Sequence, residues 1–190
     1  MNIKFNILLM ILIVISLTSA CKKEKVKPID ELPEATQEGK NTFGCLVNGE
    51  AFLPKGGRFA RPSQQCSYQF LDDRFGRGYC LSLIANNDAG PNILKIVRLE
   101  TYFKELDESK TYLLTVPGVK EEASGEYSIS NPRTLGEHYW VKPPLTGELR
   151  ITKLDKVKRI LAGTFWFDAI NDEGEKVEVR EGRFDMKYIP

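Results

Sequence analysis

The sequence GELRITKLDKVKRILAGTFWFDAINDEGEKVEVREGRFDMKY, residues 147–188, gives the clearest indication of the fold. It contains three runs of alternating apolar residues, separated by polar turns at residues 155–158 and 171–174. Because successive side chains of a strand point to opposite faces, this pattern predicts three consecutive antiparallel strands with one buried face. The buried row of the middle strand would consist of Leu161, Phe165, Phe167 and Ala169.

The last of these three runs changes face part of the way along. Val177 and Val179 occupy odd positions, whereas Phe184 and Met186 occupy even positions. A strand can exchange its apolar row only where an extra residue is inserted, so we expect a β-bulge, with Gly182 as its natural place.

The chain from residue 42 to residue 190 consists throughout of short alternating apolar runs separated by turn residues. Asn48 and Gly49 separate two apolar runs in TFGCLVNGEAFLP, which is the strongest short signal for a hairpin. CSYQFLD and GYCLSLIAN flank a longer expected loop at residues 72–78, and no helical period persists for three turns. We therefore expect residues 42–190 to form one all-β domain, an antiparallel β-sandwich or a barrel-like meander.

The N-terminus has the layout of a secretory signal peptide. A short polar start precedes the apolar run ILLMILIVISL, residues 7–17, and small residues follow as far as Ala20. The run is shorter than the roughly 20 apolar residues that a transmembrane helix needs, so cleavage is favoured over the alternative of a permanent anchor helix. We expect residues 1–20 to form a signal-peptide helix that is removed.

Cys21 directly follows the small residues, in an arrangement that resembles the bacterial lipobox. The resemblance implies a thioether-linked diacylglycerol and an amide-linked acyl chain on Cys21, and several chains together hold a protein on a membrane essentially permanently. Residues 21–41 lack aromatic side chains and mix both signs of charge, which predicts a flexible polar tether. Removing residues 1–20 deletes only Lys4 from the charged residues, so 26 basic residues balance 26 acidic ones and nucleic acid is not an expected partner.

Two motifs at the ends of the expected domain carry a family likeness. NTFGCLVNGEAFLP, residues 41–54, and GTFWFDAINDEGEKVEVREGRFDMKY, residues 163–188, resemble the two ends of a family of Bacteroidota lipoproteins that is known as a domain of unknown function. The resemblance implies a small β-rich lipoprotein domain at the cell envelope. It implies no activity and supplies no catalytic residue.

Three cysteines remain once Cys21 is assigned to lipid attachment. One disulfide and one free thiol are the natural expectation in an exported protein. Cys66 and Cys80 lie on neighbouring strands of one expected hairpin, although the alternation of apolar residues points them to opposite faces unless a bulge intervenes. A bond that uses Cys45, and three buried free thiols, stay open as alternatives. No C-x-x-C pair or cysteine–histidine cluster predicts a metal site, and no cofactor is expected.

The stretch EHYWVKPP, residues 137–144, contains the only histidine of the chain, His138. We interpret it as a loop-like aromatic cluster. The favoured interpretation is a strand edge whose aromatic side chains pack on the core, because buried aromatic side chains commonly dominate cores. The functional alternative is that Tyr139 and Trp140 form a stacking platform for a sugar ring or a peptide. A nucleophile that relied on a histidine base would have to use His138, but no G-x-S-x-G motif accompanies it.

Two arginine–aromatic elements, GGRFARP at residues 56–62 and DRFGRG at residues 73–78, supply the other candidate binding residues. They are more readily explained as loop arginines around a phenylalanine anchor, and the functional alternative is a basic patch for an anionic glycan or an acidic partner. The aspartates gather mainly in expected turns, so we expect no catalytic residues. The candidate arginines are Arg58, Arg61, Arg74 and Arg77.

The sequence therefore predicts a lipid-anchored envelope lipoprotein that is a non-enzymatic binding or assembly module. The alternatives are a glycan-binding or carbohydrate-active accessory protein and a structural subunit of an outer-membrane complex. The expected partners are the membrane, through the lipid on Cys21, and a glycan or a protein. Surface-exported lipoproteins of such bacteria tend to carry an acidic run soon after the cysteine, so the lysine-rich residues 22–25 favour the periplasmic face of the outer membrane over the cell surface.

Overall fold

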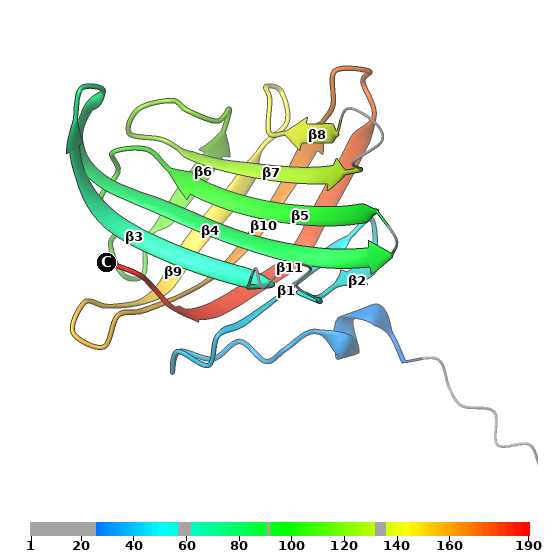
Figure 1. Cartoon of the computed structure of the whole chain (residues 1–190), viewed down its shortest axis with the longest axis horizontal. Coiled ribbons are helices and arrows are strands. Elements are labelled where there is room, and N and C mark those ends of the chain that lie inside the picture. The colour runs from blue at the N-terminus through cyan, green and yellow to red at the C-terminus, as the bar shows by residue number, and fades with distance from the viewer. Residues whose placement is uncertain (1–25, 57–61, 91, 132–135) are drawn as a thin grey trace, which may run out of the picture.

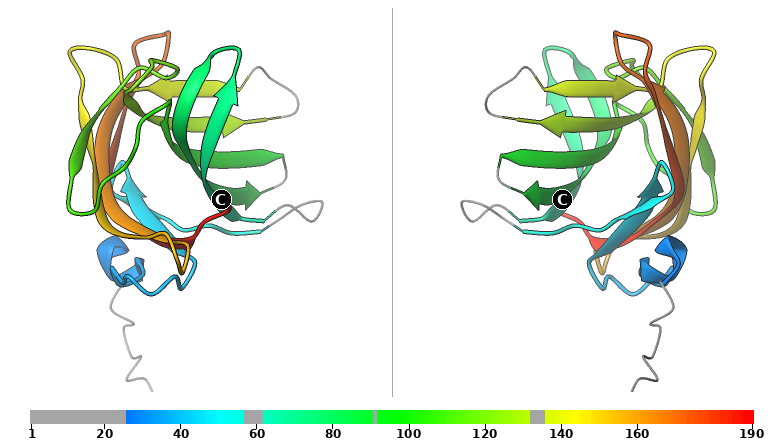
Figure 2. Two further views of the ribbon diagram at one scale, coloured as in Figure 1. Left: turned by 90° about the vertical axis from the view of Figure 1, so that its left-hand side faces the viewer. Right: turned by 90° about the vertical axis from the view of Figure 1, so that its right-hand side faces the viewer.

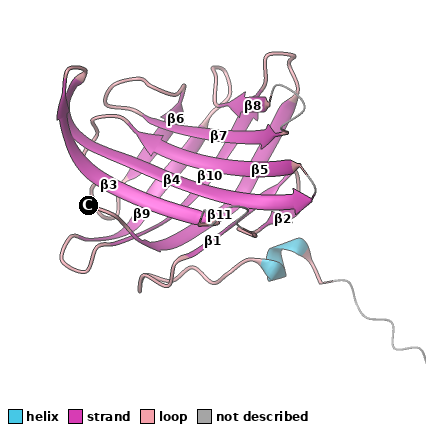
Figure 3. Ribbon diagram, viewed as in Figure 1, coloured by secondary structure: helices cyan, strands magenta, loops and turns pink. Residues whose placement is uncertain are grey.

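The computed structural model of the chain describes residues 26–56, 62–90, 92–131 and 136–190. Within these ranges the chain is nearly all β (Figure 3), with one 3-10 helix, η1 (Pro28–Glu31), and eleven strands in a single sheet. The strands are β1 (Thr42–Val47), β2 (Glu50–Phe52), β3 (Gln64–Asp73), β4 (Gly76–Gly90), β5 (Ile93–Thr101), β6 (Thr111–Thr115), β7 (Ala123–Ser130), β8 (Glu137–Trp140), β9 (Gly147–Asp155), β10 (Ile160–Ile170) and β11 (Lys176–Lys187).

The sheet runs in the order β2-β1-β11-β10-β9-β6-β7-β5-β4-β3, and β8 pairs with β7 and β10. In Figure 1, β3, β4, β5 and β7 form one side of the molecule, and β9, β10 and β11 cross behind them. Figure 2 shows the strands curling around a common interior. The edge strand β3 meets the segment after β11, where the backbone of Ile189 accepts a hydrogen bond from Tyr68 (2.9 Å) and donates one to Cys66 (3.0 Å). The prediction of an all-β, sandwich-like or barrel-like fold is confirmed.

The prediction of a wholly antiparallel sheet is wrong at one pair of strands. β6 and β7 run parallel, with Leu114 beside Ala123 and Thr115 beside Ser124. β6 is antiparallel to β9 on its other side, so it joins two antiparallel meanders. The connection at residues 116–122 carries the chain back along β6 before β7 begins, and β7 therefore points in the same direction as β6.

The three C-terminal strands β9, β10 and β11 form where the sequence predicts them. The bulge in β11 also exists, since the partners of Phe165 and Phe167 on β11 lie three residues apart instead of two. Arg180 and Glu181 form it, and Glu181 carries the positive φ of 54°. Gly182, the expected site of the bulge, has a different role: a Cβ there would lie 2.6 Å from the Phe165 ring, so only glycine lets β11 cross this ring.

The two predicted hairpins differ in how well they were placed. Asn48 and Gly49 form the turn between β1 and β2 with positive φ values of 51° and 81°, as expected. The second hairpin has no loop over residues 72–78, because β3 and β4 stay paired up to Asp73 and Gly76. Gly76 lets the strand begin this early, since any Cβ there would lie 2.5 Å from the ring of Phe103.

The segment before β1 differs from the expected flexible tether in the part that the structure describes. Asp185, on the outer face of β11, is fully buried and accepts hydrogen bonds from the Thr36 hydroxyl (2.6 Å) and from the backbone N–H groups of residues 38–40 (2.6–3.2 Å). This segment therefore packs on the domain, because it covers a carboxylate that would otherwise face solvent. The expected signal-peptide helix at residues 1–20, and Cys21, lie outside the described residues. Within the described ranges, the chain has no helix with the length and apolar character that crossing a bilayer requires.

Candidate functional site

The inward-facing side chains change from apolar to polar towards one end of the interior. Because paired residues of neighbouring strands share a face, the register across β4, β5, β7 and β8 arranges these side chains in rows. The inner row consists of Ala85, Val97, Tyr127 and Tyr139. The next row, towards the strand ends, consists of Asn87, Lys95, Ile129 and Glu137. Polar groups therefore gather at the end where β2, β8 and one end of β5 lie together in Figure 1.

A cavity of about 690 Å³ occupies this end of the interior. The β1–β2 hairpin, the ends of β4, β5 and β7, the strand β8 and the start of β11 form its walls. Its volume falls within the range of roughly 300–1,000 Å³ that is usual for small-molecule sites. The polar and aromatic lining residues on which the argument depends are Glu50, Lys95, Tyr127, Tyr139 and Glu175.

Tyr127 lies in the wall of this cavity and is only 3% exposed. Its ring packs against that of Tyr139, with 5.8 Å between centroids, but among the described residues its hydroxyl has no hydrogen-bond partner. Burial raises the pKa of Tyr127 to about 12, and nearby Cys45, Glu137 and Glu50 act in the same direction, so the phenol stays protonated at neutral pH. Arg98 Nε is the only buried side-chain nitrogen or oxygen without a hydrogen-bond partner among the described residues, so the unbonded Tyr127 hydroxyl is open to the cavity and available to a ligand there.

The Tyr139 hydroxyl, unlike that of Tyr127, has partners, because two carboxylates approach it. The phenol oxygen lies 3.0 Å from Glu137 Oε2 and 3.3 Å from Glu175 Oε2. Asn171 Nδ2 also donates to Glu175 Oε2 at 3.1 Å and helps to hold this carboxylate in place. Burial raises the pKa of Tyr139, and both glutamates raise it further, so a neutral phenol stands between two acidic groups.

The structure separates Tyr139 from Trp140, which the sequence places in one platform. Residues 137–140 form β8 rather than a loop, so neighbouring side chains face opposite sides. Tyr139 lines the cavity, whereas Trp140 lies on the outer face, stacked on His138 with 5.5 Å between centroids and beneath the Lys142 ammonium at 4.9 Å. The two aromatic residues therefore do not form a shared stacking surface.

His138 belongs to a polar network on this outer face. Its Nδ1 lies 2.7 Å from Oε1 of the buried Glu126, whose other oxygen accepts a hydrogen bond from Arg98 at 3.0 Å. Ser128 is the cross-strand neighbour of His138, but no hydrogen bond joins their side chains within the described residues. His138 is thus oriented by the Glu126 carboxylate and not by Ser128.

The candidate arginines do not gather at the cavity. Arg74 and Arg77 lie at the tip of the β3–β4 hairpin, at the far end of β4 from the cavity (Figure 1). Their guanidinium groups lie 4.6 Å from the centroid of the Phe75 ring and 5.4 Å from that of the Phe70 ring, and both rings are largely exposed. Arg58 and Arg61 lie outside the described residues.

The expected disulfide between Cys66 and Cys80 does not form. Cys66 pairs with Leu83 and faces the buried interior, whereas Cys80 pairs with Gln69 and faces outward, because no bulge intervenes to bring the two onto one face. Cys45 is buried and free as well. Within the described ranges, no group of three histidine, cysteine, aspartate or glutamate side chains is arranged to hold a metal ion.

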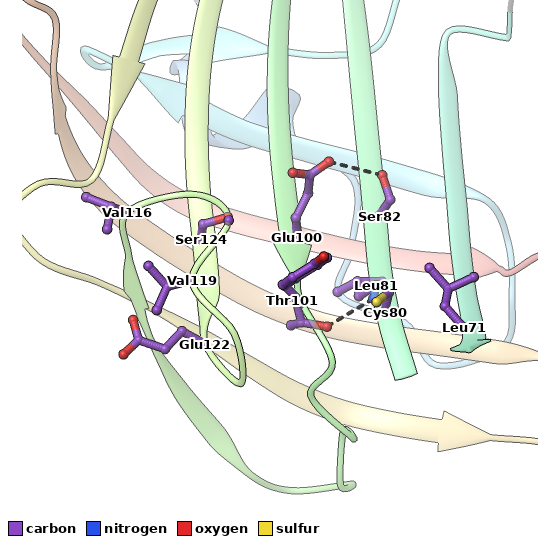
Figure 4. A pocket seen from close by; sticks show the side chains of 12 residues that line it. Leu71, Cys80, Leu81, Ser82, Glu100, Thr101, Val116, Val119, Glu122 and Ser124 are labelled. Atoms are coloured by element: carbon purple, nitrogen blue, oxygen red, sulfur yellow. Dashed lines mark hydrogen bonds between the residues drawn. The ribbon is translucent and has the colours of Figure 1, made fainter. Parts of the chain in front are cut away.

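A second pocket lies on the outer face, next to the connection at residues 116–122 (Figure 4). Its volume of about 200 Å³ is below the usual range for small-molecule sites. Glu100 and Ser82 point toward one another across it, with 3.4 Å between their oxygens, and burial raises the pKa of Glu100. The larger cavity is therefore the stronger candidate.

The sequence identified Tyr139 as a candidate but missed Tyr127, Lys95 and Glu175. The signal for Tyr127 was present in ASGEYSIS, where Tyr127 and Ile129 occupy the same alternate row. Serines and glycine weaken that pattern, and β7 was not recognised as a strand. No local signal marks Lys95 or Glu175, because strand register alone brings them to the cavity.

No protein-family model matches the chain, and no curated protein or solved structure is significantly similar to it. The likeness carried by residues 41–54 and 163–188 therefore stays a prediction.

Proposed function

We propose that this protein is a lipid-anchored, non-enzymatic module of the cell envelope that binds a small polar ligand in the cavity beside Tyr127 and Tyr139. The observation that carries the proposal is the cavity of about 690 Å³, whose wall presents the Tyr127 hydroxyl without a hydrogen-bond partner among the described residues. Small-molecule sites are concave and place a few convergent polar groups among apolar and aromatic side chains, so a cavity of this size lined by two tyrosines and polar side chains favours a ligand there.

The anchor part of the proposal rests on Cys21 and is tested separately. Lipidation at Cys21 makes the mature protein partition into the detergent phase, and the periplasmic face of the outer membrane is its proposed position. Cys21→Ser is expected to release the protein or to block its processing. A variant that still partitions into detergent like the wild type contradicts the lipid anchor.

The cavity part is tested by screening small polar molecules, including sugars and short peptides, for ligands that raise the melting temperature of the purified protein. A ligand of the cavity loses affinity in Tyr127→Phe, which removes only the unpaired hydroxyl. Tyr79→Phe is the matched control, because Tyr79 stacks on Tyr68 and does not line the cavity. Binding that is equally strong in both variants contradicts the proposed site, and a glycan that depends on Trp140 instead supports the glycan-binding alternative.

A structural role in an envelope complex is the second candidate, and the β3–β4 hairpin tip favours it. Phe75 is 63% exposed and Phe70 is 49% exposed, each beneath an arginine, and such exposed apolar groups rimmed by charge are typical of interaction surfaces. If the tip holds a complex together, Phe75→Ser makes the detergent-solubilised protein migrate as a monomer in a native gel. Unchanged migration argues against this role.

A further inference from the structure

One corner of the cavity has few hydrogen-bond donors, since only Asn171 Nδ2 and the Tyr139 hydroxyl approach Glu175 Oε2 among the described residues. Tyr139 has one hydroxyl proton, and the shorter contact, to Glu137 at 3.0 Å, is the natural place for it. The phenol oxygen then faces Glu175 Oε2 at 3.3 Å with no proton between them. Asn171 contacts Glu175 twice, because the backbone N–H of Glu175 donates to Asn171 Oδ1 at 2.8 Å and Asn171 Nδ2 donates to Glu175 Oε2 at 3.1 Å.

An ammonium group satisfies this corner. It carries three donors and a positive charge, and it therefore bonds a carboxylate oxygen and a phenol oxygen at the same time. Tyr127, whose ring packs beside that of Tyr139, supplies another hydroxyl oxygen within the same wall. Burial is the main cause that raises the pKa of Tyr127, and the carboxylates of Glu137 and Glu50 add to it.

The opposite charge lies on the other side of the same cavity. Lys95 shares the inward-facing row with Ile129 and Glu137, lines the cavity, and forms no ion pair within the described residues. β7 lies between the strands that carry Lys95 and Glu137, so their backbones are about 10 Å apart at the usual strand spacing. An inward-facing lysine without an acidic partner suits an anionic group of a ligand.

We propose that the cavity binds a small zwitterion, with its ammonium group between Tyr139 and Glu175 and its anionic group at Lys95. The two charges of such a ligand are separated by a linker of about five to seven bonds, as the strand spacing allows. The inference rests on the proposed function, because it names the class of ligand for that same cavity.

Four probes of equal chain length test the proposal: 6-aminohexanoate, hexylamine, hexanoate and hexan-1-ol. We expect calorimetric titration of the full chain in detergent to give an affinity for 6-aminohexanoate at least tenfold higher than for the other three. Lys95→Met lowers the affinity for 6-aminohexanoate to that for hexylamine and leaves hexylamine binding unchanged. Glu175→Gln weakens both amines and spares hexanoate, and Lys158→Met, in the exposed β9–β10 turn, is the matched control without effect.

Melting temperatures close to that of the wild type verify that the variants are folded, and Tyr127→Phe provides a second, milder change in the same wall. The zwitterion proposal is overturned if hexan-1-ol binds as well as 6-aminohexanoate, if Lys95→Met has no effect, or if no probe binds. In these cases the proposed function still stands when the wider screen yields an uncharged ligand that depends on Tyr127. It fails as well when no ligand of any kind depends on Tyr127.

Discussion

Replacing Asp185 by asparagine is expected to detach the segment before β1 from the domain. The buried carboxylate accepts four hydrogen bonds, from the Thr36 hydroxyl and from the backbone of residues 38–40. Three of them reach Oδ2, and the fourth, from Gly39 at 2.6 Å, reaches Oδ1. Asparagine has the same shape but lacks the charge, and its amide nitrogen must face at least one of these donors.

The expected loss of stability follows from these four bonds. Hydrogen bonds to a charged group contribute about 1.5–3 kcal/mol each and neutral ones about 1 kcal/mol, so three weakened bonds and one opposed pair of donors cost several kcal/mol. The neutral amide recovers part of this cost, because it is less expensive to bury than a carboxylate. We expect a net loss of about 3 kcal/mol, which lowers the melting temperature by roughly 6–12 °C for a chain of this length.

Urea unfolding at pH 7, followed by tryptophan fluorescence, measures this loss. Asp172→Asn is the matched control, since Asp172 is exposed and pairs only with Lys142, and its loss stays below about 1 kcal/mol. Limited trypsin digestion gives a second measurement, because Lys40 becomes cleavable in the native Asp185→Asn variant when the segment detaches. The reasoning is refuted if the two variants are equally stable and Lys40 stays protected in both.

Three further predictions concern other features of the fold. Burial raises the pKa of Asp185, but its hydrogen bonds outweigh this effect and lower the pKa. The stabilisation by Asp185 is therefore fully present above about pH 3.9 and is lost as the pH falls through the lowered pKa. Urea unfolding from pH 5 to pH 2 should show the difference in unfolding free energy between the wild type and Asp185→Asn becoming smaller, and a constant difference contradicts this. Gly182→Ala should lower the stability by about 1–3 kcal/mol, because the new methyl group collides with the Phe165 ring. Adding Phe165→Leu should recover part of this loss. A double-mutant cycle that shows no coupling refutes the stated role of Gly182. Burial raises the pKa of Cys66 to about 12, so iodoacetamide at pH 8 should label the half-buried Cys80 before Cys66 in the native protein, and equal labelling rates contradict the assigned burial.

Local patterns in the sequence were sufficient for most of the strands and for one turn, but not for β7 and β8. The alternation of large apolar residues in β10 identified its buried face, and Asn48-Gly49 identified a hairpin turn, because both depend on residues that are adjacent in the chain. The need for a bulge in β11 was also visible, since a change of parity has no other remedy. The predicted position of the bulge, Gly182, was one residue away from the observed one. Glycine is needed at position 182 for another reason, because the Phe165 ring, on another strand, leaves no room for a side chain there.

The cavity could not be found in this way, because it depends on register between strands that are far apart in sequence. Tyr127, Tyr139 and Lys95 come from three strands, and only the pairing of β5 with β7 and of β7 with β8 makes them neighbours. The same pairing separates Tyr139 from Trp140, which are adjacent in the chain. Likewise, Asp185 organises residues 36–40 across almost 150 positions of sequence. Alternation indicates which side chains share a face of one strand, but long-range backbone pairing determines which faces meet, and the candidate site is a product of that pairing.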